Sequence, residues 1–179
     1  MRKNQGMLTM RDVTVADCSD VADIYRHYVE TSTASFDYDP PDVGEWEARV
    51  AHGRSAGLPF IVAEDPDVMP GIVGFARLGP YRGKTGWAFT AENSIYLRPE
   101  AAGRGTGGRL LGALIDKAGP STVRHIMAVI SDEAPASVAL HAKAGFVESG
   151  RTPNVGYKFG RWIGVVYMHL DLGPESGAP

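Results

Sequence analysis

The sequence predicts a single α/β (α+β) domain, in which a mixed, mostly antiparallel sheet of about seven strands carries helices on both faces. Three observations predict this class. Apolar residues follow strand and helix periods in the order βαα-βββ-α-β-α-ββ. A glycine-rich turn joins a strand to an amphipathic helix near the middle of the chain. The length of 179 residues suits one domain with a substantial core.

The first half of the chain predicts a strand, two helices and two further strands. Residues 7–15 are expected to form a first strand. Asp17 is expected to cap a helix over residues 18–29, and Asp42 a second helix over residues 43–56. The next two strands are expected over residues 60–63 and 71–78.

The second half of the chain continues with a long strand and the glycine turn. The expected elements are a strand over 88–97, the central helix, a strand over 125–130, a helix over 135–144 ended by Gly145, and strands over 146–150 and 165–172. Residues 152–162, TPNVGYKFGRW, are rich in turn formers and predict a loop. The domain should span residues 1–173, followed by a disordered tail over residues 174–179.

Composition limits the function classes. The net charge is −3 and is spread along the chain, which does not suggest a nucleic-acid-binding face. The single cysteine, Cys18, cannot form an internal disulfide and suits a reducing cytosol. No apolar run approaches the length of a membrane span, and the N-terminus lacks an apolar signal core. We expect a cytoplasmic protein without a membrane segment or a metal site.

The glycine turn offers a site for an anion. A strand ends at Arg98-Pro99, and glycines follow at positions 103, 105, 107 and 108 before an amphipathic helix begins. Such a turn presents unpaired backbone N–H groups and the positive end of the helix dipole. Arg98, Arg104 and Arg109 add positive side chains around it. The stretch therefore predicts a site for a phosphorylated cofactor.

Three kinds of nucleotide site compete for this stretch. Residues 103–108 match the dinucleotide string G-x-G-x-x-G, with Asp132 at roughly the expected distance beyond it. However, a Rossmann site places its first glycine almost directly after the strand, whereas Pro99 and a turn intervene here. A Walker A loop needs Gly-Lys-Ser/Thr, and Gly108 is followed by Arg109. The third kind, a coenzyme A site, fits best because the stretch resembles a known motif for acyl-CoA.

The stretch resembles the acyl-CoA-binding motif of the GNAT superfamily of N-acetyltransferases, Gln/Arg-x-x-Gly-x-Gly/Ala, with its glycines at Gly105 and Gly107. The order of elements is also similar to the GNAT arrangement. The resemblance implies a sheet whose strands splay apart to admit acetyl-CoA. It also implies the cofactor-binding residues, which are Ile95, Tyr96, Leu97, Gly103, Arg104, Gly105, Thr106, Gly107, Gly108 and Ser137.

Glu92 is the first candidate for chemistry. Strand alternation places Thr90, Glu92, Ser94 and Tyr96 on one face and Ala91, Asn93, Ile95 and Leu97 on the other. A carboxylate inside a sheet is costly unless it is paired or used. Glu92 is therefore either a salt-bridged or edge-exposed residue, or a general base acting directly or through water.

A closer resemblance supports the second interpretation. The stretch TAENSIYLRPEAAGRGTG is similar to phosphinothricin N-acetyltransferases and related amino-acid N-acetyltransferases, whose catalytic glutamate falls on Glu92. Their pattern Ser-x-x-x-His-x-x-x-Gly-aromatic falls on Ser137, His141, Gly145 and Phe146. The resemblance implies that His141 assists either deprotonation of the amine or the leaving sulfur.

The same resemblance suggests residues for the amine acceptor. Arg82, in the loop GPYRGKTGW, falls where an arginine of the amino-acid-acetylating members meets the substrate carboxylate, and a guanidinium fork suits that group. Lys158, in GYKFGRW, falls on a lysine of the closing segment of the family. Phe36 and Tyr81 could form walls of the acceptor pocket.

Three positions depart from the pattern. Ala102 replaces the first Gln/Arg of the motif, Ala134 replaces an asparagine that contacts the cofactor, and Gly164 replaces an aspartate. The two alanines remove side-chain hydrogen bonds worth roughly 1 kcal/mol each. The backbone N–H groups of the turn are untouched, so we expect cofactor binding to persist.

Together these observations predict an acetyl-CoA-dependent N-acetyltransferase. Its expected acceptor is a small amino acid or an amino-acid-like antimetabolite of the phosphinothricin or methionine sulfone/sulfoximine type, and the resemblance implies a homodimer. Three alternatives remain. One is an acyl-CoA-binding regulatory module without activity, another is an N-acetyltransferase of a different small amine, and the most distant is a dinucleotide-dependent oxidoreductase.

Overall fold

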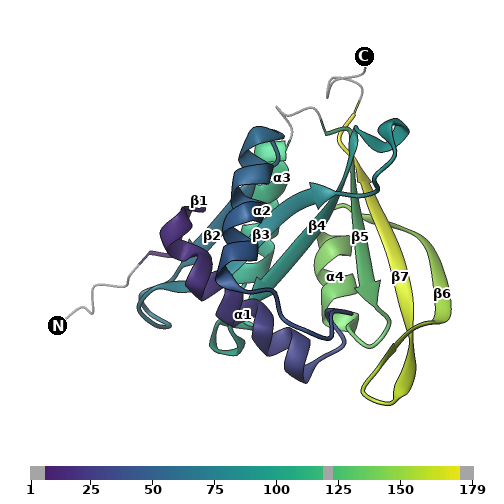
Figure 1. Ribbon diagram of the computed structural model, residues 1–179, viewed down its shortest axis with the longest axis horizontal. Coiled ribbons are helices and arrows are strands. Elements are labelled where there is room, and N and C mark those ends of the chain that lie inside the picture. The colour runs from purple at the N-terminus through teal and green to yellow at the C-terminus, as the bar shows by residue number, and fades with distance from the viewer. Residues whose placement is uncertain (1–6, 119–122, 174–179) are drawn as a thin grey trace.

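The computed structural model describes residues 7–118 and 123–173 and shows one seven-stranded sheet in the order β1-β2-β3-β4-β5-β7-β6 (Figure 1). The strands are β1 (Thr9–Asp12), β2 (Phe60–Glu64), β3 (Ile72–Pro80), β4 (Thr90–Leu97), β5 (His125–Ser131), β6 (Val147–Lys158) and β7 (Arg161–Asp171). The α-helices in these residues are α1 (Cys18–Thr31), α2 (Val43–Ser55), α3 (Thr106–Ala118) and α4 (Pro135–Lys143). The predicted fold class and order of elements are confirmed.

The helices cover the two faces of the sheet separately. On one face α1 and α2 bury Val21, Ile24 and Trp46 against Phe75 of β3. On the other face α3 buries an apolar stripe against β2, β3 and β4, and α4 packs beside it. The stripe consists of Leu110, Leu111 and Leu114, and its spacing of three and four residues is that of one helix face.

β4 and β5 are held together over a short distance only. Among the strand pairs in the described ranges, theirs alone is parallel, and it joins Thr90, Ala91 and Glu92 to His125, Ile126 and Met127. Beyond Glu92 the strands separate, and Figure 1 shows the gap widening toward their C-terminal ends. The backbone of β4 beyond Glu92 therefore has no ladder partner on the β5 side.

The prediction of a loop over residues 152–162 is wrong. β6 continues to Lys158 and β7 begins at Arg161, so the chain forms a long hairpin that turns at Phe159 and Gly160, with φ of 51° and 76°. The turn-forming residues lie between Thr152 and Gly156, where the register of the β6–β7 pairing shifts. β6 lies at the edge of the sheet, where a proline needs no ladder partner.

The cap predictions have different outcomes. The Asp42 carboxylate accepts a hydrogen bond from the Glu45 N–H at 2.8 Å, so it caps α2 as predicted. The Asp17 carboxylate does not cap α1, because it accepts from the Thr14 N–H at 2.7 Å and from the Arg11 guanidinium. The first strand is also shorter than predicted. The proposed tail at 174–179 lies outside the described residues.

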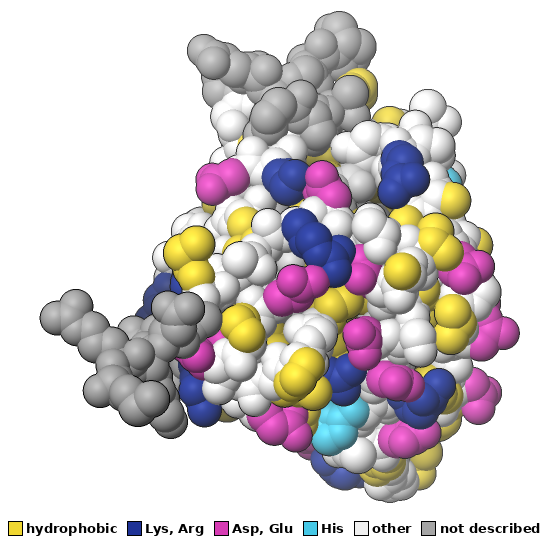
Figure 2. All heavy atoms as spheres, turned by 90° about the vertical axis from the view of Figure 1, so that its left-hand side faces the viewer, with side chains coloured by type: hydrophobic (Ala, Val, Ile, Leu, Met, Phe, Trp, Pro, Cys, Tyr) yellow, Lys and Arg dark blue, Asp and Glu magenta, His cyan; other side chains and the backbone are white. Residues whose placement is uncertain are grey.

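The surface carries charges of both signs. Figure 2 shows acidic and basic side chains interspersed over the face it presents, without a field of one sign. Over residues 7–118 and 123–173, no helix has both the length and the apolar character needed to cross a bilayer.

Candidate active site

The glycine turn forms a cradle of unpaired backbone donors. Gly103 and Gly105 have φ of 73° and 81°, values that favour glycine and let the chain reverse before α3. The first helical hydrogen bond after the turn is donated by the Arg109 N–H to the Gly105 carbonyl, at 3.2 Å. Within the described ranges, the N–H groups from Gly103 to Gly108 donate to no acceptor. We call these six N–H groups the cradle.

Two further features fit the cradle to an anionic ligand. The Thr106 hydroxyl is buried at the start of α3 and has no hydrogen-bond partner in the described part of the chain. A Cβ at Gly107 would lie 3.4 Å from Leu97 and 3.6 Å from Leu140, so glycine lets α3 pack closely on β4 and α4. The donors, the hydroxyl and the helix dipole suit the pyrophosphate of coenzyme A.

The three arginines around the turn do not act alike. Arg98 points away from the cradle, because its guanidinium donates to the Ile72 carbonyl at 2.9 Å and to Asp20 at 2.9 Å. Arg98 therefore fastens the end of β4 to β3 and α1, and the prediction that it surrounds the anion is wrong. Arg104 and Arg109 are exposed beside the cradle.

A cleft lies between β4 and β5 where the strands separate. Its walls combine β4, the end of β5 and the start of α4, and its lining includes the predicted residues Ile95, Tyr96, Ser137 and His141. Leu97 is not in this lining. Its carbonyl accepts from the Tyr28 hydroxyl at 2.6 Å, and its side chain fills the space beside Gly74 and Gly107.

The cleft also contains residues that the sequence analysis missed. Asn93, Ser131 and Ala34 contribute to its lining. The sequence held one signal for Asn93, since strand alternation places it among apolar residues on its face of β4. No local pattern could have found Ala34 or Ser131, because the fold brings them in from distant segments.

His141 is tied to two protein groups. Its ring is 2 % exposed, with Nδ1 2.8 Å from the Ser137 carbonyl oxygen and Nε2 3.0 Å from Asn93 Nδ2. A carbonyl can only accept, so Nδ1 carries the proton and Nε2 accepts from the Asn93 amide. Burial lowers the pKa of His141, which keeps the ring neutral. The imidazole therefore orients Asn93 in the cleft.

Glu92 lies at the apex of the gap, on the opposite face of β4 from Asn93. It is the last residue of β4 that pairs with β5. The side chain is half-buried, and burial raises the pKa of the Glu92 carboxyl, while the positive charges of Arg77 and Arg82 oppose that rise. A carboxylate with a raised pKa beside a cleft has the properties of a general base.

The predicted acceptor residues form two groups. Tyr81 and Arg82 lie together near the start of β4, where the exposed Arg82 guanidinium sits 5.1 Å from the Tyr81 ring centroid and 5.7 Å from that of Trp87. Phe36 belongs to the other group, because its ring covers Gly156 of β6, where any Cβ would overlap it.

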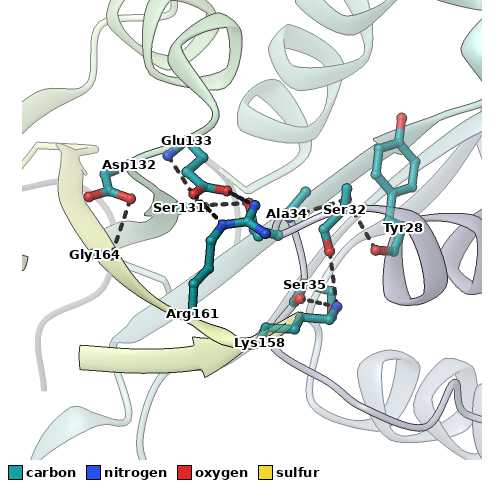
Figure 3. Close-up of polar contacts among 11 residues, drawn as sticks. Tyr28, Ser32, Ala34, Ser35, Ser131, Asp132, Glu133, Lys158, Arg161 and Gly164 are labelled. Atoms are coloured by element: carbon teal, nitrogen blue, oxygen red, sulfur yellow. Dashed lines mark hydrogen bonds and ion pairs between the residues drawn. The ribbon is translucent and has the colours of Figure 1, made fainter. Parts of the chain in front are cut away.

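Lys158 is buried and holds the segment between α1 and α2 (Figure 3). Its ammonium donates to the Ser32 carbonyl at 3.0 Å and to the Ser35 carbonyl at 2.6 Å, and the residue is 2 % exposed. Burial lowers its pKa. The predicted contact between Lys158 and the acceptor stays a prediction. The geometry favours an indirect role, in which Lys158 shapes the loop over residues 32–35.

Two acidic residues just before α4 bind the loop over residues 32–35 and the start of β7. Thr33 donates to Glu133 at 3.1 Å, and Glu133 also pairs with Arg161 at 2.8 Å (Figure 3). Next to it, the Asp132 carboxylate accepts from the Gly164 N–H at 3.1 Å, and a Cβ at position 164 would overlap that carboxylate. Glycine at this departure from the family pattern therefore leaves room for Asp132.

Replacing Lys158 with methionine tests its loop-holding role. The change keeps the length of the side chain but leaves the two carbonyls without their donor. The free energy of unfolding is expected to fall by about 1–3 kcal/mol, as measured in urea. Lys143→Met, at an exposed position of α4, is the control and should change it by less than about 0.5 kcal/mol. An unchanged or larger free energy for Lys158→Met would contradict this role.

Comparison with known proteins agrees with this geometry. The profile of the acetyltransferase (GNAT) family matches residues 21–146. The chain therefore belongs to the GNAT family, and it is an N-acetyltransferase by class. A putative acetyltransferase from Salmonella typhimurium, solved with its cofactor acetyl-CoA, superposes with a TM-score of 0.89 at 32% identity, over 95% of this chain and 96% of that one.

Two curated relatives indicate the branch of the family. A phosphinothricin N-acetyltransferase of Alcaligenes faecalis is 41% identical over 165 residues, which cover 92% of this chain and 82% of the relative. An L-methionine sulfoximine/L-methionine sulfone acetyltransferase of Pseudomonas paraeruginosa is 36% identical over 171 residues, which cover 96% of this chain and 98% of the relative.

Proposed function

We propose that the protein transfers the acetyl group of acetyl-CoA to the amino group of a small amino acid, or of an antimetabolite of the phosphinothricin or methionine sulfone/sulfoximine type. The observation that carries this proposal is the alignment of three features along β4. Glu92 stands at the apex of the gap, the unpaired strand follows, and the cradle lies just beyond the end of the strand. The names of the relatives supply the acceptor class.

Glu92 is the proposed general base. Acetyl-CoA supplies an activated thioester, so the new bond forms between the amine nitrogen and the acyl carbon while the carbon–sulfur bond breaks. Glu92 accepts the proton that the amine must lose, directly or through a water, and the departing sulfur takes up a proton. An α-amino group has a pKa of about 7.7–8.0, so this deprotonation is a modest task near neutral pH.

The other polar groups have supporting roles. Backbone N–H groups of β4 near Leu97 are proposed to stabilise the developing oxyanion. We assign His141 the smaller share of the proton transfers, because protein hydrogen bonds engage both its ring nitrogens. Arg82 is proposed to bind the acceptor carboxylate, and a homodimer remains part of the proposal.

Matched acceptor pairs test the substrate class. Each amino acid is incubated with acetyl-CoA beside its decarboxylated amine, and the free thiol released is measured. If Arg82 binds the carboxylate, the amino acid should have a kcat/KM about tenfold or more above that of the amine, since charged hydrogen bonds are worth about 1.5–3 kcal/mol. Faster turnover of plain amines would favour a different small-amine acceptor. Acetyl-CoA binding without thiol release from any acceptor would favour a regulatory module.

A further inference from the structure

Arg77, on β3, is a partly buried cation for which the described residues supply no hydrogen-bond acceptor or ion-pair partner. Its guanidinium makes no hydrogen bond or ion pair with any residue in the ranges 7–118 and 123–173, and burial lowers its pKa. By contrast, Arg98, which is also partly buried, donates to a carboxylate and a carbonyl. Arg77 is only partly exposed, so water compensates the charge of its guanidinium incompletely and the charge can act on a nearby anionic group.

The register of the sheet places this guanidinium beside the proposed base. Gly79 pairs directly with Glu92 across β3 and β4, and Arg77, two residues before Gly79, shares its face of the sheet. A Cβ at Gly79 would lie 2.8 Å from Arg77 Nη2. The guanidinium therefore extends along β3 and lies over Gly79, next to the position of Glu92.

Packing from α2 holds the Arg77 side chain in this place. Its guanidinium carbon lies 5.9 Å from the centroid of the Trp46 ring, and Arg49 lies 4.6 Å from the same centroid. Repulsion from Arg49 disfavours any movement of Arg77 toward α2. The Trp46 ring and the charge of Arg49 therefore favour a position of the Arg77 guanidinium near Glu92.

We propose that Arg77 is a positioning residue that acts on Glu92 by charge, holding the carboxylate ionised and ready to accept the proton of the amine. The inference rests on the proposed role of Glu92 as base. Arg77 acts across the space above Gly79 without an ion pair, so both oxygens of Glu92 stay available to the amine. Glycine at position 79 leaves room for the guanidinium, which a side chain there would displace.

Other charged and titratable groups surround the same face. Arg82 opposes the effect of burial on the Glu92 pKa in the same direction as Arg77. The remaining groups are Tyr25 of α1, Arg49 of α2, Tyr96 of β4, His125 of β5, and Tyr167 and His169 of β7. Because several groups contribute, the test compares variants in which Arg77 alone is removed, retained as a charge, or displaced.

The experiment measures the Glu92 pKa directly, from the ¹³C shift of its carboxyl in glutamate-labelled protein without acetyl-CoA. Glu92→Gln identifies the signal by its loss. Arg77→Met should raise the Glu92 pKa by on the order of 1 unit, since an opposite charge nearby favours the ionised form. Arg77→Lys keeps the charge and should stay nearer to the wild-type value. Arg54→Met, which removes an exposed positive charge near the end of α2, is the control and should leave the Glu92 pKa unchanged.

A double-mutant cycle with Gly79 completes the test. Gly79→Ala changes no charge, yet it should raise the Glu92 pKa by displacing the guanidinium, and it should do nothing further in the Arg77→Met background. An unchanged pKa in Arg77→Met, or an equal effect of Gly79→Ala in both backgrounds, would overturn the proposal. The readout needs no turnover, so it is independent of whether Glu92 is the base. That role fails separately, if Glu92→Gln acetylates at the wild-type rate.

Discussion

Replacing Glu92 with glutamine is expected to lower kcat by about 10²–10⁴, the usual contribution of a general base. The amide keeps the shape of the side chain but cannot accept a proton from the amine. Because burial raises the Glu92 pKa, wild-type activity should fall on the acid side as the carboxylate becomes protonated, and Glu92→Gln should lose that dependence. Steady-state kinetics over a range of pH, with a saturating acceptor, measure both effects.

Two controls accompany this measurement. Acetyl-CoA affinity by calorimetry should stay near the wild-type value, since Glu92 lies at the apex of the gap and the cradle lies beyond the other end of β4. Glu92→Asp keeps a carboxylate one methylene further away, and should retain more activity than glutamine. Wild-type turnover by Glu92→Gln across the neutral range would show that Glu92 is structural.

The second large effect is expected at Gly108, in the first turn of α3. Its exposed Cα faces open space, with the nearest neighbour of an added Cβ 4.0 Å away at Leu140. Gly108→Asp places a negative charge at the cradle. Two like charges about 5 Å apart repel by about 3 kcal/mol at a surface-like dielectric, so the acetyl-CoA Kd should rise on the order of 100-fold.

The same change should not destabilise the fold. An acidic residue in the first turn favours a helix, and replacing glycine within a helix adds to that effect. The melting temperature without ligand should therefore stay the same or rise while binding is lost. Gly108→Ala is the neutral control and should keep most of the affinity. Wild-type affinity in Gly108→Asp would mean that the cradle does not bind the pyrophosphate.

Local patterns account for what the sequence predicted correctly. The cradle follows from a strand end, a run of glycines and a helix start that are contiguous in the chain. The opposite placement of Glu92 and Asn93 follows from the two-residue period of a strand. The Asp42 cap likewise needs only the residues that follow it. Each of these features is fixed by neighbours in sequence.

The misses depend on contacts between distant segments. The proposed contact of Lys158 with the acceptor stays a prediction, but its burial was not foreseen, because its acceptors at Ser32 and Ser35 are distant in sequence. Turn formers between Thr152 and Gly156 predicted a loop, but the ladder with β7 tolerates them in an irregular edge strand. No pattern in the sequence singled out Arg77, because Trp46 and Glu92, which surround it, come from other elements.

The three-pair ladder between β4 and β5 has a consequence for the lifetime of the folded protein. It divides the sheet into two blocks. One block contains β1, β2, β3 and β4, and the other contains β5, β7 and β6, and few backbone hydrogen bonds join the two. A ligand lodged in the gap binds only when both blocks are in place, so its binding free energy adds to that of folding. Ligand binding is therefore expected to reduce how often the blocks part and the chain becomes open to proteolysis.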